Sequence, residues 1–234
     1  MSRAALPDVA VIIAAGGAGR RLGGKTPKQF LRVGTKPIIA RTVAVFERIP
    51  AVREIIVVVP RGYAVRTRRL LSRAGCRRET AVIEGGKERQ DSVRTGLDKI
   101  TGHPGIVLIH DAVRPFVAKR VILEVIQEAA RYGAAVVGVR VKDTIKKEGK
   151  RGFYEKTLQR DLLWAVQTPQ GFRTHLIKRA HEKAVKTGFL GTDDGMLVER
   201  LGFRVRIVEG DFGNVKITTR EDILSARKRV GKGV

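Results

Sequence analysis

The sequence contains one cysteine, Cys76, and few aromatic residues. A single thiol excludes an intrachain disulfide and a cluster of thiolate metal ligands. Aromatic residues make up 5% of the 234 residues, so the core must consist mainly of Val, Ile, Leu and Ala. No apolar run is long enough to span a membrane, and the run at residues 9–15 has the length of a strand. We therefore expect a cytoplasmic protein that does not associate with a membrane.

Acidic residues are also scarce relative to basic ones, and the formal net charge is +24. Such an excess favours a polyanionic partner, either a nucleic acid or a phosphorylated metabolite. The alternative is a highly charged, solvated surface of the kind found in heat-adapted proteins. The densest patch, residues 61–78, has seven arginines and no acid, and its interleaved apolar residues favour the outer face of an amphipathic helix. The positive charge raises the affinity of the protein for phosphate groups in general, but it does not identify the partner.

Short β-branched runs alternate with amphipathic helical patterns along the chain, which predicts a mostly parallel sheet covered on both faces. We expect one doubly wound α/β domain, with a Rossmann-like nucleotidyltransferase fold, over residues 1–234. The predicted strands are 9–14, 54–59, 81–84, 106–110, 134–141, 204–208 and 215–218. The predicted helices are 37–48, 66–74 (ended by Gly75), 88–100, 119–131, 174–187, 194–201 and 220–229, the last with Thr219 as N-cap and Asp222 in a capping box.

The alternation stops at a charged segment that contains the turn signal Gly149-Lys150-Arg151-Gly152. We interpret residues 142–168 as a β-arm that projects from the domain, with a flexible surface loop as the alternative. Its apolar side chains need burial, which favours a partner subunit. These side chains are Phe153, Tyr154, Leu158, Leu162, Leu163 and Trp164.

A loop rich in glycine and arginine, residues 16–28, follows the first predicted strand. Loops at the carboxyl ends of parallel strands bind ligands, and glycines let backbone amides approach phosphate. The loop therefore predicts a triphosphate site. Residues Gly19, Gly24, Lys25 and Thr26 match the P-loop pattern literally, but Pro27 follows at once and no long helix can start there. We therefore reject a P-loop, and the dinucleotide fingerprint also fails.

Other candidates lie after later strands. Asp111 ends an apolar strand and is placed to hold Mg²⁺ or ribose, although it could instead cap a helix or pair with Arg114. Gly85 and Gly86 open a helix in which Ser92 serves equally well as a helix cap or as a partner of a nucleobase. Four separate cations fit an enzyme that joins two phosphates: Arg21, Lys28, Arg160 and Lys216. No Ser-His-Asp set or zinc-ligand pattern is apparent.

Taken together, these segments resemble the 2-C-methyl-D-erythritol 4-phosphate cytidylyltransferase family over nearly the whole chain. The motifs that carry the resemblance are AAGGAGRRLGGKTPKQF (14–30), GGKERQDSV (85–93), HDAVRPF (110–116), VKDTIK (141–146), QTPQGF (167–172), TDDG (192–195) and NVKITTREDI (214–223).

The resemblance implies an in-line attack of the acceptor phosphate on the α-phosphorus of CTP, with Mg²⁺ as the cofactor. Arg21 and Lys28 would stabilise the transition state, and Arg160 and Lys216 would position methylerythritol phosphate. It also implies a homodimer joined by the arm, with Arg160 crossing to the partner's site. Cytidine would be held by Ala14, Ala15, Gly16, Gly17, Gly85, Gly86 and Ser92. Asp111 would act near ribose and metal, and the remaining substrate contacts would come from Arg114, Asp143, Thr144, Thr168 and Thr192.

Two alternatives remain. A ribitol 5-phosphate cytidylyltransferase shares much of the framework, including motifs like HDAVRPF, but residues 89–93 favour the methylerythritol enzyme. A basic nucleic-acid-binding protein would account for the charge, yet it leaves the glycine loop, Asp111 and the arm unexplained. We therefore expect CTP and methylerythritol phosphate as partners, and no nucleic acid.

Overall fold

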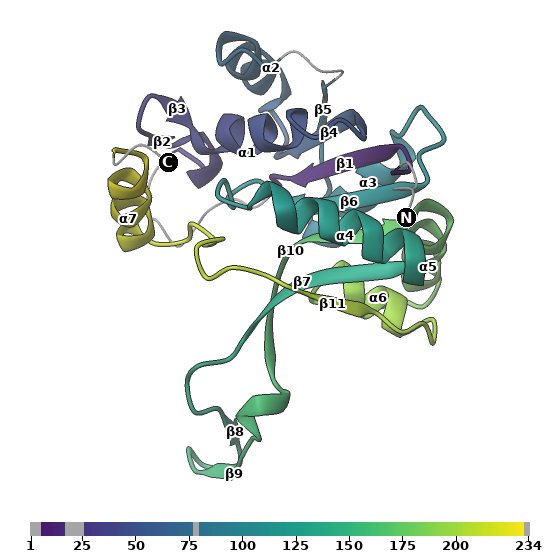
Figure 1. Cartoon of the computed structure of the whole chain (residues 1–234), viewed down its shortest axis with the longest axis vertical. Coiled ribbons are helices and arrows are strands. Elements are labelled where there is room, and N and C mark those ends of the chain that lie inside the picture. Colours follow the sequence, from purple (N-terminus) through teal and green to yellow (C-terminus); the bar gives the residue numbers. More distant parts are fainter. Residues whose placement is uncertain (1–5, 17–25, 77–79, 232–234) are drawn as a thin grey trace, which may run out of the picture.

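A computed structural model describes residues 6–16, 26–76 and 80–231 of the chain. Its centre is a seven-stranded sheet in the order β11-β7-β10-β6-β1-β4-β5 (Figure 1). All neighbouring strands are parallel except β10, which runs antiparallel to both β6 and β7. The predicted fold class, a doubly wound and mostly parallel α/β sheet, is confirmed. The strands are β1 (Val9–Ala14), β4 (Val52–Val59), β5 (Thr80–Glu84), β6 (Ile106–Asp111), β7 (Ala134–Arg140), β10 (Trp164–Arg173) and β11 (Arg206–Glu209).

Helices cover both faces of the sheet because each central strand is apolar on both sides. In β1, Val11 and Ile13 face one core and Ile12 faces the other, as the two-residue period of a strand requires. The first core is closed by α1 (Ile38–Glu47), α2 (Ala64–Arg73) and α4 (Lys119–Tyr132). The second is closed by α3 (Arg89–Asp98), α5 (Thr174–Lys186) and α6 (Asp194–Glu199).

Two predictions near the C-terminal part of the chain were wrong. Residues 215–218, predicted as a strand, pair with no strand, and a backbone hydrogen bond from the Ile217 N–H to Val113 O (2.9 Å) attaches them to the turn after β6. Residues 164–168, which we assigned to the arm, begin β10 instead. Strand β10 was missed because its sequence contains Pro169 and Gly171, which are typical of a loop. The Thr168–Pro169 peptide bond is cis, and the register of β10 on β7 shifts between Val166 and Gln170.

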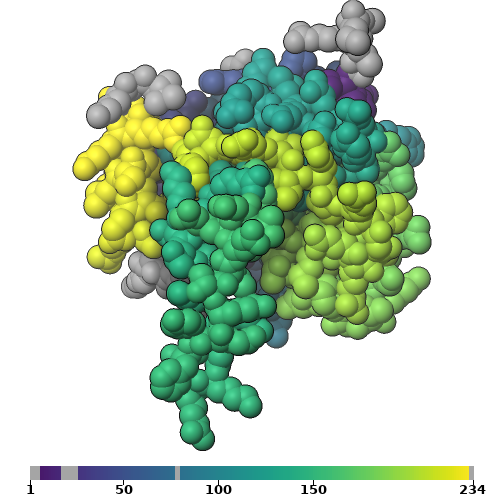
Figure 2. All heavy atoms as spheres, turned by 60° about the horizontal axis from the view of Figure 1, so that its bottom comes forward, coloured from purple at the N-terminus to yellow at the C-terminus, as the bar shows by residue number. Residues whose placement is uncertain are grey.

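The predicted arm is present and projects from the body of the domain (Figures 1 and 2). It consists of β8 (Lys146–Glu148) and β9 (Tyr154–Thr157), paired antiparallel, and the 3-10 helix η3 (Arg160–Leu162). The predicted turn is confirmed, because Arg151 and Gly152 have φ values of 55° and 79°. Phe153, Tyr154 and Leu162 are 76%, 63% and 70% exposed. The arm therefore presents apolar side chains that nothing in the described part of the chain covers.

Smaller elements flank the sheet near residues 28–37. They are the 3-10 helix η2 (Lys28–Phe30) and a hairpin of β2 (Arg32–Val33) and β3 (Lys36–Pro37). Helix α7 (Arg220–Gly231) packs beside them through Ile223 and Ala226. Its predicted capping box is confirmed: the Thr219 N–H donates to Asp222 Oδ2 (2.8 Å), and the Asp222 N–H donates to Thr219 Oγ1 (3.2 Å).

Candidate active site

The carboxyl ends of β1, β4, β5 and β6 meet at one edge of the sheet, where open α/β sheets bind ligands. Ala14 lies opposite Asp111 in the β1–β6 register, and the Ala112 N–H donates to Ala14 O (3.0 Å). The Ala15 N–H donates to Val58 O (2.8 Å) on the other side. The side-chain amide of Gln29 donates to Ala15 O (2.7 Å), which attaches η2, and with it Lys28, to the end of β1.

The predicted cytidine residues converge at this edge around the buried side chain of Ser92. A Cβ on Gly16 would lie 2.7 Å from Ser92 Oγ, and one on Gly85 would lie closer still. Only glycine lets both backbones approach the serine. Ser92 Oγ donates to Glu88 O (3.1 Å), whereas Glu88 itself is the N-cap of α3, so Ser92 is not the helix cap.

Gly86 packs equally tightly, because a Cβ there would clash with the Asp91 side chain of the capping box. The structure therefore brings together Ala14, Ala15, Gly16, Gly85, Gly86 and Ser92. Two other predicted residues of the glycine loop, Gly17 and Arg21, lie outside the described residues.

Asp111 is the centre of the charged part of the site. Its carboxylate lies 2.9 Å from Lys216 Nζ and 3.5 Å from the Nε atoms of Arg89 and Arg114. Burial alone would raise the pKa of Asp111, but the charges of Arg89, Lys216 and Arg114 hold it well below its usual range. The pairing of Asp111 with Arg114, one of the alternatives for this aspartate, is present, and it coexists with the two other ion pairs.

A cavity of about 250 Å³ opens above this cluster and joins several predicted residues. It is lined by Arg89, Asp111, Arg114, Val166, Gln167, Thr168, Gln170, Thr192, Asp193 and Lys216. Its walls come from β6, β10, the start of α3, the loop before α6 and the segment before α7. Three cations and a cluster of polar groups at the end of a sheet form a site for an anionic substrate.

Arg89 joins the two sides of this cavity, and we did not predict its role. Its Nη1 lies 2.6 Å from Oδ2 of the buried Asp194, while its Nε faces Asp111. The two carboxylates outweigh the effect of burial and raise the pKa of Arg89, so the guanidinium is charged. Asp194 also contacts His181 Nε2 (3.1 Å). Because 105 residues separate Arg89 from Asp194, no local pattern could reveal the pair.

Gln170 fixes the opposite wall. Its side-chain oxygen accepts hydrogen bonds from the N–H groups of Asp194 and Gly195 (both 3.1 Å), at the start of α6. Its amide nitrogen donates to Asp193 Oδ2 (2.7 Å), and Asp193 Oδ1 caps α6 by accepting from the Met196 N–H (2.9 Å). These bonds hold the loop that contains Thr192 beside the cavity.

Thr168 connects the cavity to a buried histidine. The Asp111 N–H donates to Thr168 Oγ1 (3.1 Å), which lies 3.0 Å from His110 Nδ1, and His110 Nε2 lies 2.9 Å from Arg114 O. Because a carbonyl only accepts, Nε2 carries the proton of the neutral ring and Nδ1 accepts from the threonine. Complete burial is the main cause that lowers the pKa of His110 to about 4.

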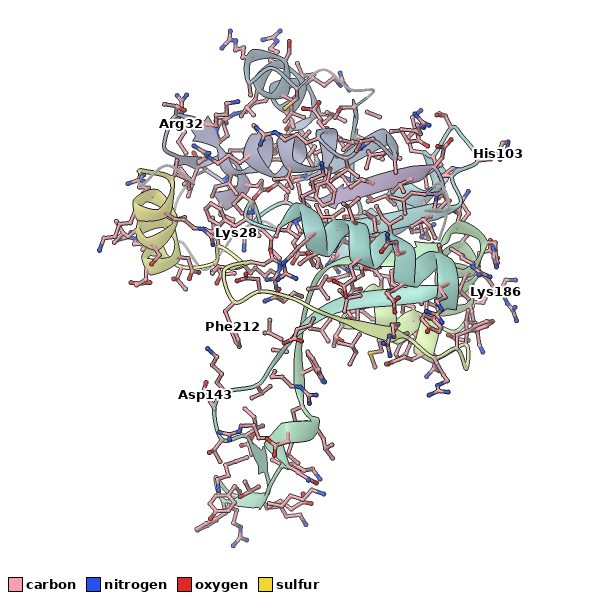
Figure 3. All side chains as sticks on the ribbon, in the orientation of Figure 1. Lys28, Arg32, His103, Asp143, Lys186 and Phe212 are labelled. Atoms are coloured by element: carbon pink, nitrogen blue, oxygen red, sulfur yellow. The ribbon has the colours of Figure 1, made fainter. Side chains whose placement is uncertain are left out.

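The residues predicted in the arm lie apart from this cavity in the same chain. Arg160 Nη1 donates to Lys142 O (3.0 Å) and lines a separate hollow at the base of the arm with Arg140, Val141 and Asp161. Thr144 is exposed. Figure 3 shows Asp143 in the same region, well away from Lys28. One chain therefore does not bring Asp143, Thr144 and Arg160 to Asp111 and Lys216.

The described residues contain no group of three His, Cys, Asp or Glu side chains that could hold a metal ion. Asp111 and Asp193 are the carboxylates in the lining of the cavity. In the same part of the chain, no helix is both long enough and apolar enough to cross a membrane.

Comparison with known proteins places this arrangement in a family. Residues 9–232 match the family of 2-C-methyl-D-erythritol 4-phosphate cytidylyltransferases. The chain belongs to this family. The cytidylyltransferase of Geobacillus kaustophilus is 49% identical over 215 residues, which are 92% of this chain and 93% of that protein. The corresponding enzyme of Pelotomaculum thermopropionicum is 43% identical and covers 94% and 93% of the two chains.

Solved structures of the cytidylyltransferase family share the fold. The Thermus thermophilus enzyme has a TM-score of 0.80 and 33% identity, with 96% of this chain and 99% of that chain covered. The 4-diphosphocytidyl-2C-methyl-D-erythritol synthase of Anaerococcus prevotii has a TM-score of 0.85 and 28% identity, with 96% of each chain covered. In both comparisons the similarity extends over 96% of this chain.

The buried His110 predicts a pH dependence of stability for this cytidylyltransferase family member. Its pKa is about 4 in the folded chain and about 6.5 unfolded, so the unfolded chain binds the proton more readily. The contribution of His110 to the free energy of unfolding is therefore fully present above pH 6.5. As the pH falls to 4, this free energy decreases by on the order of 3 kcal/mol. We expect His110→Gln to flatten this part of the curve in urea unfolding. Exposed His103, as His103→Gln, is the control and should leave the slope unchanged; an unchanged slope in His110→Gln would contradict the assignment.

Proposed function

We propose that this chain transfers the cytidylyl group of CTP to 2-C-methyl-D-erythritol 4-phosphate and releases pyrophosphate. The reaction belongs to the non-mevalonate synthesis of isoprenoid precursors. Membership of the family and the names of its relatives support this activity. The observation within the site that carries it is the cluster of Arg89, Arg114 and Lys216 around Asp111, beside the Gly16–Ser92–Gly85 contact.

The proposed mechanism needs no covalent enzyme intermediate. An oxygen of the acceptor phosphate attacks the α-phosphorus of CTP, and the bond to the β-phosphate oxygen breaks on the opposite side. Negative charge accumulates on the α-phosphate and on the departing pyrophosphate. Lys28, fixed beside β1 by its neighbour Gln29, and Arg21 would stabilise this charge. Lys216 would position the acceptor phosphate at the cavity.

We further propose that a magnesium ion accompanies the nucleotide. Magnesium is usually held by one or two carboxylates together with substrate phosphates, rather than by a cage of protein ligands. Asp111, whose carboxylate faces Lys216 at the edge of the sheet, would supply the carboxylate of such a site. When bound, the ion would neutralise phosphate charge.

The cellular compartment of the protein, for which we predicted the cytoplasm, stays a prediction.

The active enzyme would be a homodimer joined by the arm. The exposed apolar residues of the arm need a partner. Arg160, Asp143 and Thr144 would then complete the acceptor site of the partner's chain, because they do not reach the cavity of their own chain.

The activity is tested by measuring pyrophosphate release with a panel of nucleotides and acceptors. We expect CTP with methylerythritol phosphate to give a kcat/KM far above that of every other pair. Equal or better turnover of ribitol 5-phosphate would instead establish the ribitol enzyme. Absence of pyrophosphate release, together with tight nucleic-acid binding that weakens steeply with salt, would establish the nucleic-acid-binding alternative.

The transition-state role is tested by Lys28→Ala and Arg21→Ala. Each should lower kcat about 100-fold or more with little change in the KM for CTP, because the lost interaction strengthens as charge develops. Lys186→Ala is the control, since Figure 3 shows Lys186 at the end of α5, away from Lys28. Near-normal rates in both variants would refute the proposed roles.

Crossing of Arg160 to the partner's site is tested by complementation. Arg160→Ala and Lys216→Ala should each inactivate the homodimer. When the two variants are co-expressed with different tags, the purified mixed dimer should regain about half of the wild-type rate, because one site then holds both lesions and the other none. If Arg160 acts within its own chain, each site carries one lesion and the mixed dimer stays inactive. A monomer in sedimentation would refute the dimer itself.

A further inference from the structure

A second cationic site lies between α2 and the β2–β3 hairpin, at a groove of about 830 Å³. Five cations line it: Arg32 and Lys36 from the hairpin, and Arg66, Arg69 and Arg73 from α2. No acidic residue is among the described residues that form its lining. This groove contains none of the residues assigned to the catalytic site, although Phe30 on its wall belongs to η2, the element that carries Lys28.

The cations of α2 occupy one side of the helix because of their spacing. Residues three and four apart are neighbours on a helix surface, which places Arg66, Arg69 and Arg73 together. The opposite side of α2 packs in the core through Ala64 and Leu71. All five cations are exposed, and the hairpin adds Arg32 and Lys36 to the lining that the α2 arginines share. The positive charge therefore converges from two elements on one volume.

Contacts with the protein orient three of these side chains. Arg32 donates from Nε (3.1 Å) and Nη2 (2.6 Å) to Thr35 O, and Lys36 Nζ donates to Ala74 O (3.4 Å). The guanidinium of Arg66 lies 5.6 Å from the ring centre of Phe30. Each group keeps further N–H donors for a ligand. The ion pairs between residues that the structure describes include none of these five cations.

The aromatic ring in the groove indicates which part of a ligand the groove recognises. Phe30 stacks on Tyr63, with 5.2 Å between ring centres and 10° between planes, and Arg66 also contacts the ring. Phe30 therefore has its stacking partners within the protein and offers no platform for a nucleobase. Recognition through five cations alone suits phosphate groups, and guanidinium forks match phosphate oxygens in pairs.

We propose that this groove binds a chain of linked phosphates, two or three phosphoryl groups long, at a site separate from the catalytic one. Five cations match the charge of a triphosphate, and the volume of the groove exceeds what a single phosphate needs. Inorganic triphosphate and the triphosphate of a nucleotide share this chemistry. The proposal does not depend on the proposed function, because none of the five cations belongs to the catalytic machinery.

Equilibrium dialysis with inorganic triphosphate at low ionic strength tests the groove. The wild-type chain should bind two equivalents, one in the groove and one at the glycine-rich loop. The variant Arg66→Gln/Arg69→Gln/Arg73→Gln should bind one, with the groove affinity lowered about tenfold or more. Its cytidylyl transfer should stay normal, and that activity together with circular dichroism shows that the variant folds.

The matched control removes the same charge elsewhere. The control variant is Arg179→Gln/Lys183→Gln/Lys186→Gln, whose three positions are exposed on α5. It should still bind two equivalents of triphosphate. An equal number of equivalents in the wild type and in the α2 triple variant, or an equal loss in both triple variants, would overturn the proposal. One equivalent in the wild type and none in the α2 variant would keep the groove and remove the second equivalent assigned to the glycine-rich loop. Repeating the dialysis with CTP distinguishes the two sources of the linked phosphates. Two equivalents of CTP indicate that the groove accepts nucleotides. One equivalent of CTP, in a protein that binds two of inorganic triphosphate, indicates that the groove takes inorganic polyphosphate.

Discussion

The carboxylate of Asp111 is the group around which the rest of the site is organised. It is nearly buried at the end of the central strand, and removing an unpaired carboxylate from water costs several kcal/mol. Its charge is balanced by Lys216 at 2.9 Å and by Arg89 and Arg114 at 3.5 Å. These cations come from the segment before α7, from α3 and from the turn after β6. The demand for pairing thus holds three distant parts of the chain at one edge of the sheet.

The same pairing prepares the site for phosphate. Arg89 divides its guanidinium between Asp111 and Asp194, which joins the wall formed by the end of β6 to the wall that carries Thr192. Asp111 and Asp194 fix the three cations in place before a substrate arrives, and Asp193 adds a further carboxylate to the wall of the cavity. Because oriented charges need little rearrangement when a phosphate becomes more negative, such a cluster stabilises a transition state more than a mobile surface lysine does.

Much of the fold could be predicted from periodicity alone. Val9–Ala14 and Ile106–Asp111 are apolar throughout, as strands buried on both faces must be, and their order gave the parallel core of the sheet. Strand β10 was missed because its antiparallel insertion depends on pairing with β6 and β7, and Pro169 with Gly171 conceals it locally. The prediction for residues 215–218 was wrong in the opposite sense, because it placed a strand where there is none. Their alternation resembles a strand, but the backbone hydrogen bond from the Ile217 N–H to Val113 O (2.9 Å) is not continued into a ladder.

The site could be predicted only where its chemistry is local. Glycines 16 and 85 follow strands, so their place at the carboxyl edge of the sheet could be inferred, whereas the Arg89–Asp194 pair exists only through folding. The position of the arm relative to the active site also could not be predicted from local patterns. The cavity at Asp111, about 250 Å³, lies below the volumes typical of a site for one small molecule, and Gly85 and Gly86 border a separate hollow of about 700 Å³. Arg160, Asp143 and Thr144 are the chemically suited groups that remain, and they lie on an arm that reaches away from its own cavity. A second chain is the simplest means of bringing them to the substrate, so dimerisation would be a requirement of the reaction and not merely a way to cover apolar surface.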